Sequence, residues 1–349
     1  MKRESKQVKP LSVREMVKGC MQEQVKFWPH GLDLETDFIA MHTFVETLRH
    51  SKEKAFIEVE KNGHLMFKRG RFATHSELGR SLTPQLRSRF QFSPQIRELL
   101  AARDLFSIPD FECDPNEEIR GKPMGERLNL VVERVREKCT GKVFLDDIHN
   151  RRVNVLRNCA SADAVIADIS SRIRRPFVAR FELAYEGELH NQLFERPDYL
   201  RGHLRHFFNN WRRHEGYIWK IGYGSISGYH AHVVMFFNGD KISWRDEYRA
   251  ICAHWRRTTG TNAGLIIDWA GDRKGILGDG SGYWDVGMKV AKKKELRKAL
   301  YYLIQKDEYF RPAYLFRTFG ATEVREGKPT VASSSGPQRS LKALRIGVP

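Results

Sequence analysis

Two histidines, His230 and His232, stand one residue apart within a run of apolar residues. The run from Tyr229 to Phe237 is apolar beyond the histidines and predicts a central strand covered on both sides. Residues two apart in a strand point to the same face, so both imidazoles project together while Ala231 turns away. Imidazole is the commonest metal ligand in proteins, and two on one face supply half of a divalent metal site. A His-x-His pair also occurs as ordinary, partly buried polar residues, so the motif needs a second element.

That second element is the helix predicted over Lys292 to Lys306. Tyr302 lies beside its apolar stripe and shares a ridge with Lys306 one turn away, whereas Tyr301 flanks the opposite side of the stripe. A phenol is a weak nucleophile because its pKa is about 10. A neighbouring ammonium and a metal-polarised phosphate would make it competent. On the helix alone, packing explains the two tyrosines better than catalysis does. The stripe consists of Leu296, Leu300, Leu303 and Ile304.

The elements around these residues predict an α+β domain with a central, mostly antiparallel sheet flanked by helices. Strands are expected where apolar residues alternate, and helices where they recur at three and four residues. The expected strands are 177–185, 217–223, 229–237 and 265–267, and the expected helices are 199–214, 244–257 and 292–306.

The first half of the chain predicts a mainly helical region that precedes this domain. Its clearest helix is Glu126 to Cys139, and a hairpin of 55–60 with 64–68 is expected to turn at Asn62-Gly63. The stretch 153–173 is less regular, and no chemical motif stands before about residue 172. We therefore divide the chain into an N-terminal accessory domain (1–173), the sheet domain (174–322) and a disordered basic tail (323–349).

The charge points to a polyanion as the partner. Lys and Arg number 60 against 43 Asp and Glu, for a net charge of +17. Nucleic acid is the first expectation and an anionic membrane surface the second. The contacts expected with DNA are Arg205, Arg212 and Arg213 on the helix 199–214 and Lys220 on the next strand, with interleaved aromatic rings available for base stacking.

Several classes of protein are excluded. No apolar run approaches 18 residues, and the basic N-terminus lacks the apolar stretch of a secretory signal. The five cysteines are odd in number and scattered, which predicts reduced thiols in a cytoplasmic protein. A G-x-x-x-x-G-K-[ST] phosphate loop is missing, so the chain is not expected to be its own helicase.

A strand His-x-His followed by a helix with Tyr and a downstream Lys resembles the HUH family of single-strand nicking enzymes. The order of four blocks is similar to the domain of inovirus gene II-type replication proteins, also called the YagK/YfjJ C-terminal domain. The resemblance covers roughly residues 174–322. The blocks are Gly216-Tyr-Ile-Trp-Lys-Ile-Gly-Tyr-Gly224, Gly228-Tyr-His-Ala-His-Val-Val-Met-Phe-Phe-Asn-Gly239, Tyr302-Leu303 and Arg317-Thr-Phe-Gly320.

This resemblance implies a role for each matching residue. His230 and His232 would bind Mg²⁺ or Mn²⁺, and Tyr302 would be the nucleophile, with Tyr301 as the second choice. Lys306 would assist it. The chain departs from the family pattern at Gly222, where an acidic residue is usual, so the third ligand stays unassigned. It departs again at Gln305, where a lysine is usual.

The implied function is that of a rolling-circle replication initiator of a filamentous phage or prophage in the cytoplasm of a bacterial host. Such a nicking and strand-joining endonuclease cuts single-stranded origin DNA, forms a 5′-phosphotyrosine and leaves a 3′-OH primer for a host helicase and polymerase. One alternative is a non-catalytic DNA-binding regulator on a degenerate HUH scaffold. Another is an RNA-binding sheet, which predicts aromatic side chains on the face that we assign to the histidines.

Overall fold

The computed structural model describes residues 34–73, 87–88, 90–108, 114–185, 196–224, 228–260, 264–268, 281–313 and 317–324. Almost all of the predicted C-terminal tail therefore lies outside the described residues. Within these ranges no helix is both long and apolar enough to cross a membrane.

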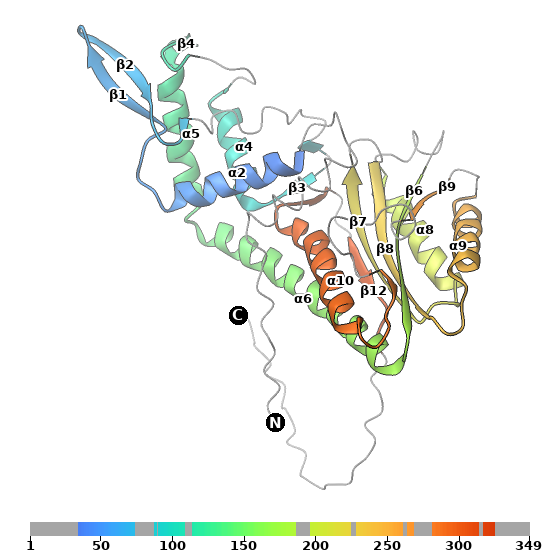
Figure 1. The fold of residues 1–349 in the computed structure, drawn as a ribbon. Coiled ribbons are helices and arrows are strands. Elements are labelled where there is room, and N and C mark those ends of the chain that lie inside the picture. Colours follow the sequence, from blue (N-terminus) through green and yellow to red (C-terminus); the bar gives the residue numbers. More distant parts are fainter. Residues whose placement is uncertain are drawn as a thin grey trace, which may run out of the picture.

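Six strands form one antiparallel sheet in the order β10-β6-β8-β7-β12, and β9 pairs with the second half of β6 (Figure 1). Strand β8, which carries the His-x-His pair, lies between β6 and β7, as its apolar run predicted. The strands are β6 (Pro176–Tyr185), β7 (Gly216–Gly224), β8 (Gly228–Asn238), β9 (Gly264–Asp268), β10 (Gly282–Tyr283) and β12 (Phe319–Ala321).

Helices cover both faces of this sheet. On one face, α8 (Pro197–Asn210) and α9 (Trp244–Thr259) pack on the odd-numbered residues of β6 and β8, such as Phe181 and Val233. On the other, α6 (Lys142–Arg172) and α10 (Lys289–Gln305) pack on Val178 and Val234. The alternation that predicted the strands thus separates two hydrophobic cores. The predicted α+β class is confirmed.

The first half of the chain forms a third core from α2 (Leu34–Arg49), α4 (Pro94–Leu105) and α5 (Met124–Lys138). The predicted hairpin is present as β1 (Phe56–Lys61) and β2 (His64–Arg69), with Asn62 and Gly63 at positive φ in its turn. A second small ribbon pairs β4 (Glu118–Ile119) with β5 (Lys122–Pro123).

The two halves of the chain are packed together. Strand β3 (Phe90–Phe92) pairs with β11 (Phe310–Pro312), which follows α10 and the short 3₁₀ helix η2 (Lys306–Glu308). Tyr302 and Leu303 of α10 are buried in the core of the first half. Packing therefore crosses the boundary that we predicted at residue 173, and α6 lies against the sheet (Figure 1).

Two elements differ from their predicted form. The stretch 153–173, predicted to be less regular, belongs to the 31-residue helix α6, which buries Val155, Cys159 and Val165 along one side. Helix α8 ends at Asn210 and not at His214, because Trp211 leaves the helical conformation and its ring stacks on Phe207 at 6.2 Å.

Candidate metal centre

The strand register brings a carboxylate beside the two histidines. Glu182 of β6 pairs with His232 of β8, and Lys220 of β7 pairs with the same histidine from the other side. The three side chains share the α6/α10 face of the sheet, because partners in register point to the same side. His230 lies two residues along β8 on this face, opposite Gly222 of β7.

The side chains of Glu182, His230 and His232 lie close together. Oε1 of Glu182 lies 2.8 Å from Nδ1 of His232, and Nε2 of His232 lies 3.2 Å from Nε2 of His230. One ligand atom from each residue falls within 4.8 Å of the others. Glu182 and His230 are each 8% exposed. We call Glu182, His230 and His232 the Glu-His-His cluster.

The environment of each imidazole favours an available Nε2 lone pair. Nδ1 of His230 lies 3.1 Å from the carbonyl oxygen of Gly228, which accepts a hydrogen bond if the ring carries its proton on Nδ1. Nδ1 of His232 faces the Glu182 carboxylate, although the contact lacks the angle of a hydrogen bond. With protons on both Nδ1 atoms, two lone pairs oppose each other, and a cation between them removes that repulsion.

The charge states of the cluster suit a divalent cation. Burial lowers the pKa of His232 to about 4, so this imidazole is neutral near pH 7. Burial alone would raise the pKa of Glu182, but the neighbouring His232 and His230 outweigh it and hold that pKa at about 2. The site therefore offers one carboxylate and the neutral imidazole of His232 beside a second imidazole, a donor set that fits a divalent ion.

Gly222 makes room for the two rings. A Cβ atom at this position would lie 3.1 Å from Nε2 of His230 and 3.2 Å from Nε2 of His232. An acidic side chain, as the family resemblance led us to look for here, would need the same space. The carboxylate is supplied from the opposite side, by Glu182, which the sequence analysis did not identify. The sequence gives one signal for Glu182: it stands on the even-numbered face of β6, opposite the apolar stripe of odd-numbered residues.

The two candidate tyrosines of α10 have different surroundings. The Tyr301 hydroxyl donates to Asp163 of α6, and burial together with this bond raises its pKa. Tyr302 is buried in the core of the first half of the chain. Nζ of Lys306 lies 4.5 Å from the centre of its ring. Asp307, the residue after Lys306, pairs with Lys220 at 2.9 Å, and Lys220 is the strand neighbour of His232, so this end of α10 lies close to the Glu-His-His cluster.

The residues that we predicted to contact DNA lie in two places. Arg205, Arg212 and Arg213 belong to α8 and the segment after it, so they lie on the sheet face opposite the histidines, where Arg213 pairs with Glu247. Lys220 is 4% exposed and lies beside His232 in register. The structure thus brings Lys220 to the candidate centre and leaves the three arginines away from it.

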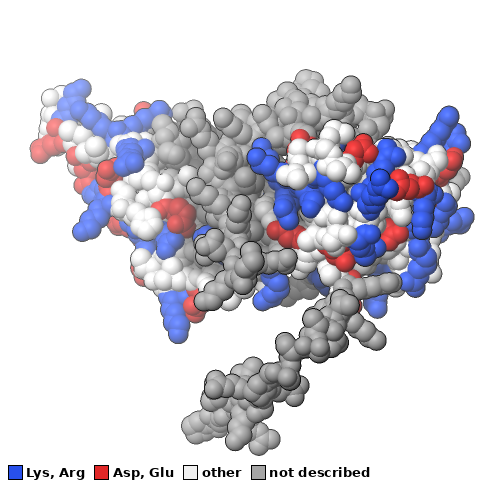
Figure 2. Space-filling view, turned by 60° about the horizontal axis from the view of Figure 1, so that its bottom comes forward, with Lys and Arg blue, Asp and Glu red and all other residues white. Residues whose placement is uncertain are grey.

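Charge and aromatic side chains do not by themselves mark a nucleic-acid surface. In Figure 2, lysines and arginines are spread over the visible face of both halves, with acidic side chains between them. The aromatic residues near the histidines on their sheet face, Phe236 and Phe319, are at most 1% exposed. The described part of this face therefore lacks the open aromatic platform that an RNA-binding sheet would need.

Comparisons with known proteins give no relative: no family model, no curated protein and no solved structure matches the chain. The fold and the site by themselves define an α+β protein whose central strands carry a Glu-His-His cluster that could hold a metal ion.

Proposed function

We propose that this chain is a metal-dependent endonuclease that nicks single-stranded origin DNA through Tyr302. The observation that supports it best is the position of Tyr302 and Lys306 at the end of α10 that the Lys220–Asp307 ion pair holds beside the Glu-His-His cluster. A nucleophile, a cation and three metal ligands are the groups that a phosphoryl transfer to tyrosine requires.

Glu182, His230 and His232 would hold the divalent ion. Bound there, Mn²⁺ or Mg²⁺ would polarise the phosphate of the scissile bond and offset its charge. Two imidazoles make this donor set softer than the all-oxygen sites that Mg²⁺ prefers, which favours Mn²⁺.

The chain's own side chains would carry out the transfer. The phenolic oxygen of Tyr302 attacks phosphorus and loses its proton, a P–O bond to tyrosine forms, and the bond to the 3′ oxygen breaks. The departing 3′ oxygen takes up a proton and becomes a 3′-OH. Lys306 would offset the negative charge that develops at the phosphate. The phosphotyrosine conserves the bond energy, so the reverse attack by a 3′-OH joins strands without ATP.

The resemblance gives this role to Tyr302 before Tyr301, and Nζ of Lys306 lies 4.5 Å from the centre of the Tyr302 ring. The Tyr301 hydroxyl is engaged by Asp163, and Asp163 is also held by Arg297 at 2.8 Å. Tyr301 would have to break that network before it could act. The family resemblance extends the proposal to a rolling-circle initiator of a filamentous phage or prophage, with host helicase and polymerase as later partners in the bacterial cytoplasm.

The alternative of a non-catalytic DNA-binding regulator rested on Gly222, where the expected acidic residue is missing. The carboxylate of Glu182 in the cluster removes that reason.

The test is incubation with labelled single-stranded DNA and Mn²⁺, followed by denaturing electrophoresis. We expect a covalent protein–DNA adduct that Tyr302→Phe abolishes and Tyr301→Phe retains. DNA binding by the wild type without an adduct in Mn²⁺ or Mg²⁺ would favour the regulator instead.

A further inference from the structure

A polar hollow of about 220 Å³ lies where α6, η2, β11 and β12 meet. It is outside the Glu-His-His cluster and involves none of the residues that the proposed chemistry uses. Three arginines and two asparagines contribute to its lining, with one carboxylate. These residues are Arg151, Arg311, Arg317, Asn154, Asn158 and Asp307.

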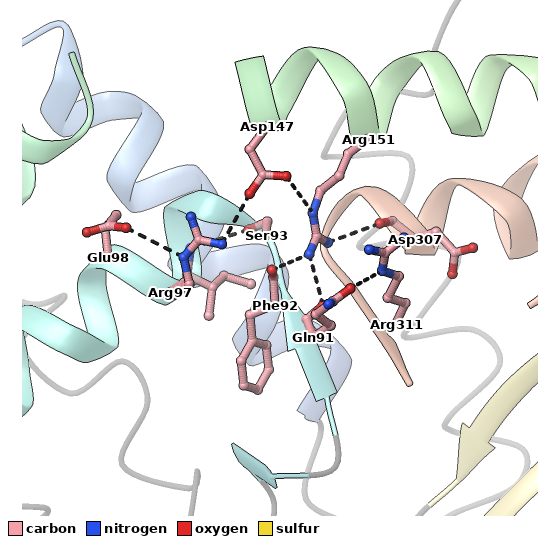
Figure 3. Close-up of polar contacts among 10 residues, drawn as sticks. Gln91, Phe92, Ser93, Arg97, Glu98, Asp147, Arg151, Asp307 and Arg311 are labelled. Atoms are coloured by element: carbon pink, nitrogen blue, oxygen red, sulfur yellow. Dashed lines mark hydrogen bonds and ion pairs between the residues drawn. The ribbon is translucent and has the colours of Figure 1, made fainter. Parts of the chain in front are cut away.

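Arg151 is the buried cation of this hollow, 7% exposed. Its guanidinium donates to the backbone carbonyls of Gln91, Phe92 and Asp307, so it is fixed in one orientation between α6 and the β3–β11 ribbon (Figure 3). Its Nε has no hydrogen-bond acceptor, and the carboxylate nearest to that nitrogen, in Asp147, is 3.9 Å away. Carbonyl oxygens accept from the two terminal nitrogens of Arg151 but carry no net charge, so the distant Asp147 is the carboxylate that pairs with this guanidinium.

The hollow as a whole is short of negative charge. Asp307 is its one carboxylate, and Lys220 already pairs with it at 2.9 Å while Thr318 donates to its other oxygen at 2.8 Å. Arg311 donates to the side-chain amide oxygen of Gln91, which is neutral. No described carboxylate pairs with Arg317, which is the exposed arginine of the lining.

The titration of Arg151 agrees with this imbalance. Burial lowers the pKa of Arg151 to about 10, and the charges of Arg311 and Arg97 lower it further against the opposing effects of Asp147 and Asp307. The guanidinium stays protonated near pH 7, and an added anion would relieve the repulsion among these cations.

The hollow is adjacent to the candidate metal centre. Phe319 of its lining pairs with Lys220 on β12 and β7, and Lys220 pairs with His232 on β8. Neighbouring strands are about 4.8 Å apart, so His232 and Phe319 are separated by about 10 Å across the sheet. A single oligonucleotide strand can span this distance.

We propose that this hollow binds a backbone phosphate of single-stranded DNA next to the phosphate that is cleaved. The identity of the substrate rests on the proposed function. Arginine presents a planar fork of donors that matches two phosphate oxygens, and asparagine adds neutral donors. The volume is below the roughly 300 Å³ at which pockets for whole small molecules begin, so it suits a phosphodiester group more than a free nucleotide with its base.

The experiment measures binding of a fluorescent single-stranded octanucleotide by anisotropy in EDTA, where metal-dependent cleavage cannot occur. The test variant is Arg317→Ala, whose side chain is exposed and makes no ion pair with a described residue; Arg311→Ala is the second. The matched control is Arg174→Ala, an exposed arginine beyond the far end of α6, about 30 Å along that helix from Arg151. We expect each test variant to weaken binding about tenfold relative to the control. We also expect the dependence of log K on log salt to fall by about 0.7.

Two results would overturn the proposal. One is octanucleotide binding by both test variants that equals that of Arg174→Ala. The other is competition by inorganic pyrophosphate or a mononucleotide as strong as that of the unlabelled octanucleotide, which would make the hollow a site for small anions.

The result for the phosphate site can be told apart from the result for the proposed nuclease activity. Loss of octanucleotide binding in Arg317→Ala, with no adduct in the wild type, would keep the phosphate site and remove the nuclease. An adduct in the wild type, with unchanged binding in both variants, would do the reverse.

Discussion

Nζ of Lys220 lies 2.9 Å from Oδ1 of Asp307, in an ion pair whose two side chains are 5% and 11% exposed. Lys220 is the strand neighbour of His232, and Asp307 directly follows Lys306 at the end of α10. The ion pair therefore connects the end of α10, the helix that carries Tyr302, to the strands that carry the candidate metal ligands. A lysine that we predicted to contact DNA thus has a place in the framework of the site.

Replacing one member of this pair should destabilise the protein. Lys220→Met leaves the Asp307 carboxylate buried without its cation, and such changes cost about 3–5 kcal/mol. The double variant Lys220→Met/Asp307→Asn should recover most of that loss, because the amide oxygen still accepts from Thr318. Urea unfolding of the three proteins measures this. If the single and double variants are equally stable, the pair does not carry the role that we give it.

Gly222, which faces His230 from the neighbouring strand, gives a second prediction. Gly222→Ala should force the rings of His230 and His232 apart, because the new Cβ would lie 3.1–3.2 Å from both Nε2 atoms. We expect a tenfold or larger loss of Mn²⁺ affinity by calorimetry.

The control for this change is Gly202→Ala in α8, where a new Cβ meets no atom within 4 Å. It should keep the metal affinity of the wild type and raise the free energy of unfolding by about 0.5–1 kcal/mol, because alanine favours the helix. Equal metal affinity in Gly222→Ala and Gly202→Ala would count against our assignment of the ligands.

Local patterns were enough to predict most of the elements of the second half. Alternation in 177–185 predicted β6, and the apolar run in 229–237 predicted β8. The two-residue spacing of His230 and His232 placed both on one face, which the structure confirms. These predictions depend only on the geometry of a single strand.

The third ligand could not be predicted in this way. Glu182 reaches His232 only because β6 and β8 pair in one register across the intervening helix α8 and strand β7, and no pattern within either strand fixes that register. Likewise, Tyr302 is buried against the first half through the pairing of β3 with β11, two strands of three residues that lie more than 200 positions apart. Such short segments carry almost no periodic signal.

Acid should destabilise the protein through two half-buried histidines away from the metal centre. Burial lowers the pKa of His42 and of His214 to about 4, and described groups offer no hydrogen-bond acceptor to the Nδ1 atoms of either ring. In the unfolded chain each imidazole binds a proton below about pH 6.5. Stability is therefore full above pH 6.5 and falls as the pH drops towards 4, by at most about 1.4 kcal/mol per pH unit for each histidine.

Urea unfolding from pH 4.5 to 7.5 in EDTA measures this dependence. His42→Gln and His214→Gln should each flatten the curve between pH 4.5 and 6.5, whereas His206→Gln, at an exposed position on α8, should leave it unchanged. A curve that is the same in all four proteins would show that other groups govern the response to acid.

Metal addition should stabilise the folded chain, and Mn²⁺ more than Mg²⁺ at equal concentration. An ion that binds only the folded state adds about 2.7 kcal/mol at a hundred times its Kd. The Glu-His-His cluster offers two nitrogen donors and one carboxylate, which favours Mn²⁺ over an ion that prefers six oxygen ligands. Thermal unfolding with each ion and with EDTA measures the difference.

Glu182→Gln keeps the size of the side chain but removes its charge, so this variant should lose most of the stabilisation by Mn²⁺. Glu308→Gln, a carboxylate at the end of η2 outside the cluster, should keep it. Equal stabilisation of both variants by Mn²⁺ would place the ion elsewhere.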